Sequence, residues 1–167
     1  MNRRRRIPME LRLTRQPPPA PRAFRSVRQE DRNDLAILLY AAFRGTVDDE
    51  GETFTEALFE IDRTFSGAYG RLLTDCSFVA ERDQFLMSTS LIGISEPKGV
   101  PLVVFSMTRP DVQRHGWGQF LLQRSIDALV DRGHERLRLI VTDGNRAAQS
   151  LYASLGFEPM SPSTRTV

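Results

Sequence analysis

Cysteine and histidine are scarce in this chain of 167 residues, which has one cysteine and two histidines. The lone Cys76 excludes an internal disulfide and a multi-cysteine metal site, and we interpret it as a buried strand residue without a covalent role. The histidines stand at no ligand spacing, so we predict no metal site. No apolar run approaches the roughly 20 residues that span a bilayer, and none follows the arginines at 3–6 as a secretory signal would require. We therefore expect a cytoplasmic protein without a membrane span.

Charge is unevenly distributed along the chain. With 40% hydrophobic and 26% charged residues, the composition is that of one ordinary globular domain. The formal net charge is +2, but residues 1–22 hold seven arginines and one glutamate, net +6, which leaves −4 for the remainder. Nucleic-acid-binding surfaces usually carry their basic patch on the folded body, so this distribution argues against a nucleic-acid partner. We divide the chain into a basic, proline-rich tail at 1–22 and a domain at 23–167.

The tail permits several interpretations. Its arginines fit a solvated disordered segment or an upstream start codon, and they also fit an arm that binds nucleic acid. The proline-rich run at 16–21 excludes a helix or a central strand and predicts an extended linker. Before it, residues 9–14 alternate in polarity, which allows a short edge strand.

Hydrophobic periodicity predicts ten elements from residue 24 onward. Asp31 is expected to cap the first helix, and Thr53 with Glu56 forms a capping box at the start of the second. A three-stranded antiparallel meander follows, and a late β-α-β unit with a right-handed crossover adds a parallel pair. The expected fold is α+β, with a mixed sheet and the order β-α-α-β-β-β-α-β-α-β. The expected strands are 24–28, 77–81, 85–93, 101–108, 137–141 and 157–160, and the helices are 34–43, 54–65, 117–132 and one that begins at 145.

The stretch 113–118 is the most informative part of the chain. It reads Gln-Arg-His-Gly-Trp-Gly and joins a strand candidate to an amphipathic helix. Free backbone N–H groups converge at such a turn and the helix dipole favours negative charge, which makes an anion site. A side chain at Gly116 or Gly118 would push a phosphate away from the backbone. The spacing fits neither the Walker pattern nor Gly-x-Gly-x-x-Gly, and alone such a turn is more often structural than a ligand site.

A second motif lies one helix and one strand further along. Residues 145–157 read Asn-Arg-Ala-Ala-Gln-Ser-Leu-Tyr-Ala-Ser-Leu-Gly-Phe, and the first motif covers 112–118 with Leu121 and Leu122. Together, in this order, the two resemble the GNAT superfamily of acetyl-CoA-dependent N-acetyltransferases. That family's motifs read Arg/Gln-x-x-Gly-x-Gly/Ala and Asn-x-x-Ala-x-x-Leu-Tyr-x-x-x-Gly-Phe. The resemblance covers about residues 100–159.

The resemblance implies acetyl-CoA as cosubstrate and assigns roles to residues. The pyrophosphate would lie on the backbone N–H groups of 114–119, and the pantetheine arm would pair with a strand end that family members splay from the next strand. Tyr152 would protonate the leaving thiolate as general acid. The implied cofactor-binding residues are Ser106, Met107, Thr108, Gln113, Arg114, His115, Gly116, Trp117, Gly118, Gln119 and Asn145.

The motifs leave the general base unassigned. An acceptor amine is mostly protonated at neutral pH and must lose a proton before it attacks the thioester. The strand at 102–108 contains no Glu or Asp, although many family members take their base from it. The acidic stretch at 48–56 offers Asp49, Glu52 and Glu56, which would suit a cationic amine. The same carboxylates also fit a solvated loop that complements a helix dipole.

We expect an N-acetyltransferase that moves an acetyl group from acetyl-CoA to a primary amine by direct transfer in a ternary complex. The acceptor partner is a small-molecule amine or a polypeptide amine. The alternative is an acyl-CoA-binding sensor or interaction domain without turnover, which the missing strand carboxylate keeps open. Because this family commonly pairs, a homodimer is possible. Only ten residues follow Phe157, so we expect the C-terminal edge to be shortened or completed by a partner chain.

Overall fold

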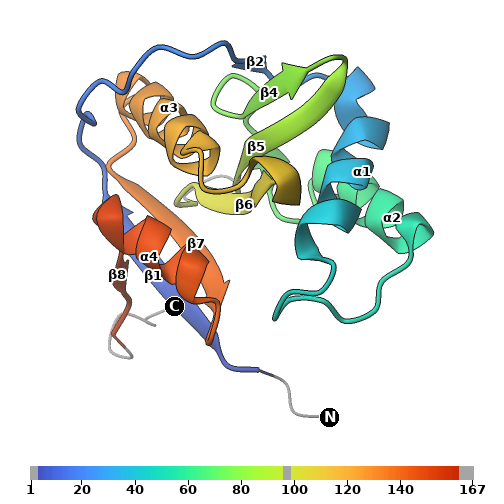
Figure 1. Cartoon of the computed structure of the whole chain (residues 1–167). Helices are drawn as coiled ribbons and strands as arrows, with labels where there is room; N and C mark the ends of the chain where they lie inside the picture. Colours follow the sequence, from blue (N-terminus) through green and yellow to red (C-terminus); the bar gives the residue numbers. More distant parts are fainter. Residues whose placement is uncertain (1–3, 96–98, 162–167) are drawn as a thin grey trace.

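The computed structural model describes residues 4–95 and 99–161, in which helices cover both faces of one sheet (Figure 1). The strands are β1 Arg6–Arg12, β2 Arg25–Ser26, β3 Arg71–Leu72, β4 Phe78–Arg82, β5 Phe85–Ile94, β6 Leu102–Thr108, β7 Arg136–Thr142 and β8 Glu158–Pro159. The helices are α1 Arg32–Phe43, α2 Phe54–Phe65, α3 Trp117–Asp131 and α4 Arg146–Ser154, with 3-10 turns η1 Gln29–Asp31 and η2 Pro110–Val112.

The sheet is mixed, as the sequence predicts. Its order is β2-β4-β5-β6-β7-β1-β8, and β3 pairs with β5 outside this path. Every pairing of these strands is antiparallel except that of β6 with β7. The α+β fold and its single parallel pair are therefore confirmed.

Alternating side chains divide the core into layers on the two faces of the sheet. Leu91 of β5 packs with residues of α1 and α2, whereas the next residue, Ile92, packs with residues of α3, β7 and β1. The α1–α2 layer contacts β4, β5 and β6, and the layer with α3 and α4 extends over β7 and β1. This division follows from the two-residue period of a strand, which sends successive side chains to opposite faces.

Strand β1 is the main departure from the sequence analysis. It pairs with β7 along all seven of its residues, from Arg6 opposite Thr142 to Arg12 opposite Arg136, and β8 pairs with its other side. Met9 and Leu11 point into the core and are 5% exposed. This burial favours a strand over a solvated tail. The segment 1–22 assigned to a tail therefore contains a strand at 6–12. The sequence allowed a short edge strand at 9–14, but the observed strand begins earlier and is paired on both sides.

Strand β1 also completes the far side of the sheet, next to β7. The sequence analysis expected that edge to be shortened or to take a strand from a partner chain. In the residues that the structure describes, the N-terminal strand of the same chain fills the place beside β7. Glu10 of β1 also forms ion pairs with two arginines of β7, at 2.7 Å from Arg138 and 3.8 Å from Arg136.

The two predicted helix caps have different outcomes. Thr53 and Glu56 form the expected capping box, with the Glu56 N–H donating to Thr53 Oγ1 at 3.2 Å and the Thr53 N–H donating to Glu56 Oε2 at 2.7 Å. Asp31 stands at the N-cap position of α1 but makes no capping bond. Its carboxylate instead binds the Arg25 guanidinium, with distances of 2.8 and 2.9 Å.

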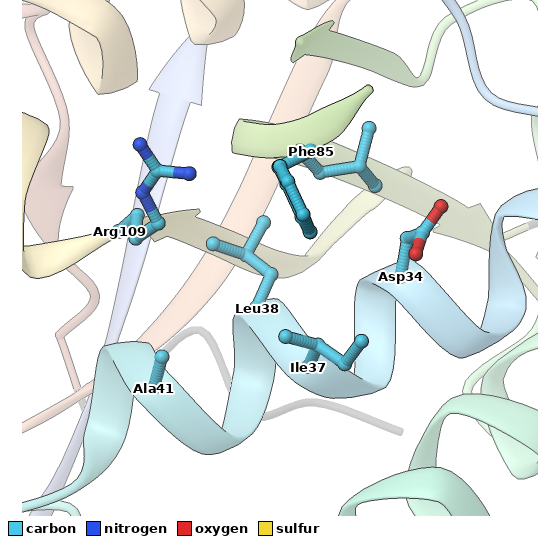
Figure 2. A pocket seen from close by; sticks show the side chains of 7 residues that line it. Asp34, Ile37, Leu38, Ala41, Phe85 and Arg109 are labelled. Carbon is cyan, nitrogen blue, oxygen red and sulfur yellow. The ribbon is translucent and has the colours of Figure 1, made fainter. Parts of the chain in front are cut away.

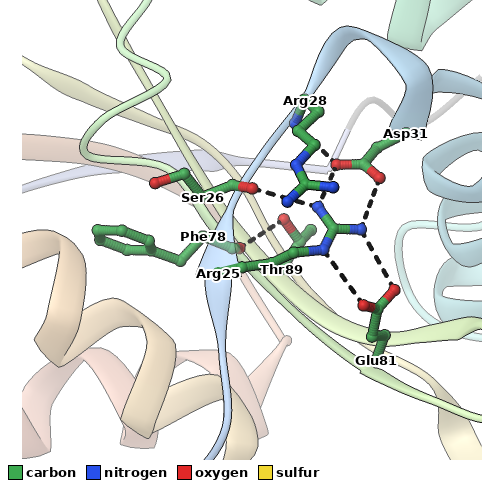
Figure 3. A network of polar contacts seen from close by, with 7 residues as sticks. All are labelled: Arg25, Ser26, Arg28, Asp31, Phe78, Glu81 and Thr89. Atoms are coloured by element: carbon green, nitrogen blue, oxygen red, sulfur yellow. Dashed lines mark hydrogen bonds and ion pairs between the residues drawn. The ribbon is translucent and has the colours of Figure 1, made fainter.

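The Arg25–Asp31 pair is the centre of a polar network that joins β2, η1 and β4 (Figure 3). The Arg28 N–H also donates to Asp31 at 2.7 Å, and Arg25 reaches Glu81 of β4 at 3.2 Å. Burial raises the pKa of Asp31, but the hydrogen bonds from Arg25 and from the Arg28 backbone outweigh it, so the pKa of Asp31 is lowered overall. The buried carboxylate is therefore held in its charged form.

Replacement of Leu11 by Ala tests whether β1 belongs to the folded core. Removing a buried leucine side chain costs about 3 kcal/mol of unfolding free energy. Arg12→Ala is the matched control, because Arg12 is exposed on the same strand and a surface change there costs no more than about 0.5 kcal/mol. Urea unfolding measures both. Equal urea midpoints for the two variants would contradict the burial of Leu11 and would indicate that residues 6–12 form a solvated tail.

Replacement of Asp31 by Asn tests the polar network. Removing one partner of a buried ion pair costs roughly 3 kcal/mol at pH 7. Because the folded-state pKa of Asp31 is lowered, its contribution is present above the unfolded-state pKa of about 3.9 and is lost as the pH falls through the folded-state value. The stability gap between wild type and variant should therefore close below about pH 4. A gap that stayed constant down to pH 2 would contradict this linkage, and Glu81→Gln, on the exposed partner, should cost under about 1 kcal/mol.

Candidate active site

The parallel strands β6 and β7 touch only where they begin. Their single register pair is Leu102 with Arg138, next to a 2.9 Å hydrogen bond from the Arg138 N–H to the Pro101 carbonyl. The pairing of β5 with β6 is also irregular, because Leu91 pairs with Phe105 and Ile92 with Val103, which leaves Val104 as a bulge. Beyond Leu102 the edge of β6 that faces β7 keeps unpaired backbone groups. The predicted splay is therefore present, and it ends at Ser106, Met107 and Thr108.

The glycine turn closes the open end of this splay. The Gln113 side chain donates from Nε2 to the Thr108 carbonyl at 3.0 Å, which fastens the turn to the end of β6. Arg114 and Gly116 adopt left-handed backbone angles, with φ of 66° and 80°. No side chain caps the start of α3. Its first N–H groups thus lack intrahelical partners, and the turn has the geometry of an anion site.

Gly118 lies close to both the end of β6 and α4. A methyl group on Gly118 would stand 3.4 Å from Thr108 Oγ1 and 3.6 Å from Leu151 Cδ2. The end of β6, the start of α3 and the second motif on α4 therefore converge, as the sequence analysis expected. The other predicted residues of the turn, Arg114, His115 and Gln119, are exposed.

Asn145 begins α4 and bridges to the acidic loop. Its Oδ1 accepts the Ala148 N–H at 3.2 Å as a helix cap, and its Nδ2 donates to Asp48 Oδ2 at 3.0 Å. Asp48 therefore lies at the mouth of the splay, beside the second motif. This contact joins the α1–α2 loop to the far side of the cleft.

Tyr152 lies about two turns further along α4, on its buried side, and is 9% exposed. Burial raises the pKa of its phenol, a hydrogen-bonding interaction with the Ser106 side chain lowers it, and the charge of Asp48 raises it, with a net rise. The phenol is therefore protonated at neutral pH, as a general acid must be. Its proximity to Ser106 puts it next to the open edge of β6.

The base candidates of the sequence analysis have structural partners instead. Asp49 accepts the N–H groups of Gly45 at 2.6 Å and Gly51 at 2.9 Å, which lower its pKa and hold the loop in shape. Glu56 belongs to the capping box, whose hydrogen bonds from Thr53 lower its pKa. Glu52 accepts the Glu50 N–H at 3.1 Å. All three carboxylates are exposed.

The carboxylate that contacts the second motif is Asp48, which was not among the base candidates from the sequence. Four acidic residues stand at 48–52, and no spacing rule separates one from its neighbour. The distinction depends on the loop geometry that Asp49 fixes and on Asn145, which is almost a hundred residues away in sequence. The one available signal was the predicted approach of this acidic stretch to the acceptor site.

A separate hollow lies between α1 and the start of β5 (Figure 2). Ile37, Leu38 and Ala41 of α1 face Phe85 of β5 there, with Asp34 and Arg109 at the rim, and Leu86 completes the lining. None of these residues belongs to either motif, so the hollow is distinct from the splay.

The family of the chain follows from its match to a sequence model. The sequence model of the acetyltransferase (GNAT) family matches residues 39–157. The chain belongs to this family. The match includes the acidic loop, the splayed strands, the glycine turn and α4, so the predicted resemblance is confirmed.

Individual relatives agree with this membership. The chain is 33% identical over 96 residues to the ribosomal protein bS18-alanine N-acetyltransferase of Salmonella typhimurium, an alignment that covers 58% of this chain and 62% of that protein. The chain thus aligns with less than two thirds of that relative's length.

Solved structures show the same fold. The ribosomal-protein-S18-alanine N-acetyltransferase of Escherichia coli superposes with a TM-score of 0.64 at 24% identity, over 83% of this chain and 79% of that one. A GNAT family acetyltransferase from Brucella melitensis, in complex with acetyl-CoA, gives a TM-score of 0.62 at 20% identity, over 84% of this chain and 87% of that one.

Among the helices of the described residues, none has the length and apolar character needed to cross a bilayer.

Replacement of Tyr152 by Phe tests the predicted general acid. The change removes only the hydroxyl, so it should leave packing and acetyl-CoA affinity nearly intact and lower kcat by roughly 10²-fold or more. Steady-state thiol release and calorimetry with acetyl-CoA separate the two effects. Ser106→Ala is a useful companion, because it removes the hydroxyl partner and leaves the acid in place, so its effect on kcat should be much smaller. Equal turnover in wild type and Tyr152→Phe would exclude the acid role.

Proposed function

We propose that the protein is an N-acetyltransferase that moves an acetyl group from acetyl-CoA to a primary amine by direct transfer. The observation that carries the proposal is the meeting of Asp48, Asn145 and Tyr152 at the open edge between β6 and β7. These residues supply a carboxylate, an amide and a phenol beside unpaired backbone N–H groups. The family membership supports acetyl-CoA as the donor.

Each group at the splay has its own proposed role in acyl transfer. Asp48 takes a proton from the acceptor ammonium, directly or through one water, and so frees the nitrogen lone pair. As the C–N bond forms, the backbone N–H groups along the free edge of β6 donate to the oxyanion. Tyr152 then gives its proton to the sulfur as the C–S bond breaks, and the nitrogen gives up its remaining excess proton to the Tyr152 phenolate, directly or through one water, which restores the phenol. The products are an amide and a free thiol.

The same geometry supports the cofactor contacts that the family resemblance implies. The N–H groups of 114–119 would hold the pyrophosphate, and Gln113 would act through the turn that it fastens to Thr108. Ser106, Met107 and Thr108 would pair with the pantetheine arm as an added strand would. Asn145 already uses Oδ1 and Nδ2 within the protein, but an amide oxygen has two lone pairs and an amide nitrogen two hydrogens, which leaves one of each for the cofactor.

The acceptor is proposed as a cationic amine, because the mouth of the cleft carries the acidic loop at 48–52. Related proteins named for their acceptors include the bS18-alanine N-acetyltransferases and an aminoglycoside 6'-N-acetyltransferase. A polypeptide N-terminus and a small polyamine-like molecule therefore both fit the proposal. A cytoplasmic setting and pairing with a second copy remain predictions.

The alternative of an acyl-CoA sensor without turnover loses its main support. The sequence analysis kept it open because β6 carries no carboxylate. Asp48 supplies one from the α1–α2 loop, and the Asn145 contact holds it at the cleft. A sensor would bind acetyl-CoA without releasing thiol in the presence of any amine.

Replacement of Asp48 by Asn tests the proposed base. With acetyl-CoA and a panel that contains an alanine-starting peptide, an aminoglycoside and spermidine, wild type should release thiol with at least one amine. For that amine the variant should lose roughly 10²-fold or more in kcat at pH 7. The deficit should shrink as the pH rises toward the amine's own pKa, because an already neutral amine needs no base.

Glu50→Gln is the matched control, since it removes the same charge from the same loop at an exposed carboxylate. It should leave kcat within about twofold of wild type at every pH, because its carboxylate is not placed at the cleft. A deficit in Asp48→Asn that stayed constant with pH would indicate a structural role and overturn the base assignment. Binding of acetyl-CoA without thiol release from any amine would favour the sensor.

A further inference from the structure

The segment between β1 and β2, residues 13–24, runs along α3 from its C-terminal end to its N-terminal end (Figure 1). Arg15 forms an ion pair with Asp131 at the last residue of the helix. The Gln16 N–H donates to Asp127 at 3.0 Å, one turn earlier. At the other end Phe24 packs edge-on against Phe120, with ring centroids 5.4 Å apart. The extended, proline-rich linker is therefore anchored at both ends.

This course carries Arg22 to the glycine turn. Its guanidinium carbon lies 4.7 Å from the centre of the Trp117 ring and 5.9 Å from that of Phe120. Its Nη2 lies 3.3 Å from the point that a side-chain carbon on Gly116 would occupy. The cation thus sits beside the first residues of α3, in the space that the absent side chain of Gly116 leaves open.

The electrostatics of this position are unusual. Cations are favoured at the C-terminal end of a helix and opposed at the N-terminal end, where the N–H dipoles also point outward. Arg15, Arg124 and Arg132, the other arginines along this helix, pair with Asp131, Asp127 and Asp75. Arg22 stacks on aromatic rings and forms no ion pair within residues 4–95 and 99–161. A half-buried guanidinium beside a helix N-terminus is repelled by the helix dipole, so a bound anion between the two would stabilise both.

We propose that Arg22 binds the phosphates of acetyl-CoA and makes the protein selective for phosphorylated thioester donors. The inference rests on the proposed function. The backbone N–H groups of the turn would hold one face of the pyrophosphate, and Arg22 would add charge-assisted hydrogen bonds from beside it. Stacking on Trp117 keeps the guanidinium plane in place, so little side-chain freedom is lost on binding. The residue comes from outside both motifs, from a linker that only the folding of β1 positions.

The test compares two donors with the same reactive end. Arg22→Met keeps an apolar contact with Trp117 and removes the charge. It should raise the KM for acetyl-CoA about tenfold, the effect expected for losing a charge-assisted hydrogen bond, and leave kcat within about twofold. With S-acetylpantetheine, which has no phosphate, kcat/KM should be unchanged. Arg22→Lys, which keeps the charge but not the stacked plane, should fall between wild type and Arg22→Met.

Arg15→Met is the control, because it removes an arginine from the same linker at the far end of α3. It should alter neither donor's kinetics. An equal loss with both donors in Arg22→Met would mean that Arg22 only supports the turn, and unchanged KM for acetyl-CoA would mean that it does not meet the phosphates. Either result overturns this inference alone. Failure of wild type to bind acetyl-CoA by calorimetry would overturn the proposed function instead.

Discussion

The site depends on one constraint, which is that β6 and β7 pair at a single position and then separate. A parallel pair that opens leaves backbone N–H and C=O groups unsatisfied on both strands. On β6 these groups form an unpaired strand edge, with which an extended ligand can pair as an added strand would. On β7 the loss is offset on the other side, because β1 pairs with every residue of that strand. The opening that serves the chemistry is thus stabilised by the N-terminal strand, which takes no part in the chemistry.

The open end of the splay is bridged by contacts between the segments on its two sides. The α1–α2 loop and the start of α4 lie on opposite sides of the splay, and Asn145 joins them through Asp48. Arg4 adds a second tie, with Nη1 donating to the Val47 carbonyl at 2.8 Å. Asp49 bends the loop through two backbone amides so that its neighbour points at the cleft. Adjacent carboxylates therefore differ in role: Asp49 shapes the loop, and Asp48 contacts Asn145 and is the proposed base.

Most of the fold follows from local sequence signals, and the failures share a cause. The predicted helices and longer strands from residue 24 onward lie within a few residues of the observed ones, because periodicity and capping residues act over short distances. The alternation around Met9 and Leu11 allowed a short edge strand, but it could not show that this strand lies between β7 and β8. Asp31 was expected to cap α1, but its carboxylate is occupied by the Arg25 guanidinium and the Arg28 N–H. In the site, the motifs identify the glycine turn, Asn145 and Tyr152, whereas Asp48 and Arg22 become visible only when distant segments are brought together.

Charge counted along the sequence gave a misleading picture of the surface. Six net positive charges at 1–22 were separated from a mildly acidic domain, yet the structure distributes those arginines over the body. Arg4 reaches the acidic loop, Arg15 pairs at the end of α3, and Arg22 stands beside the glycine turn. The acidic residues collect in the α1–α2 loop beside Asn145, and Arg22 lies beside the glycine turn, where the phosphates are proposed to bind. A field of this polarity orients a donor with an anionic tail and an acceptor with a cationic head so that their reactive atoms meet in the splay.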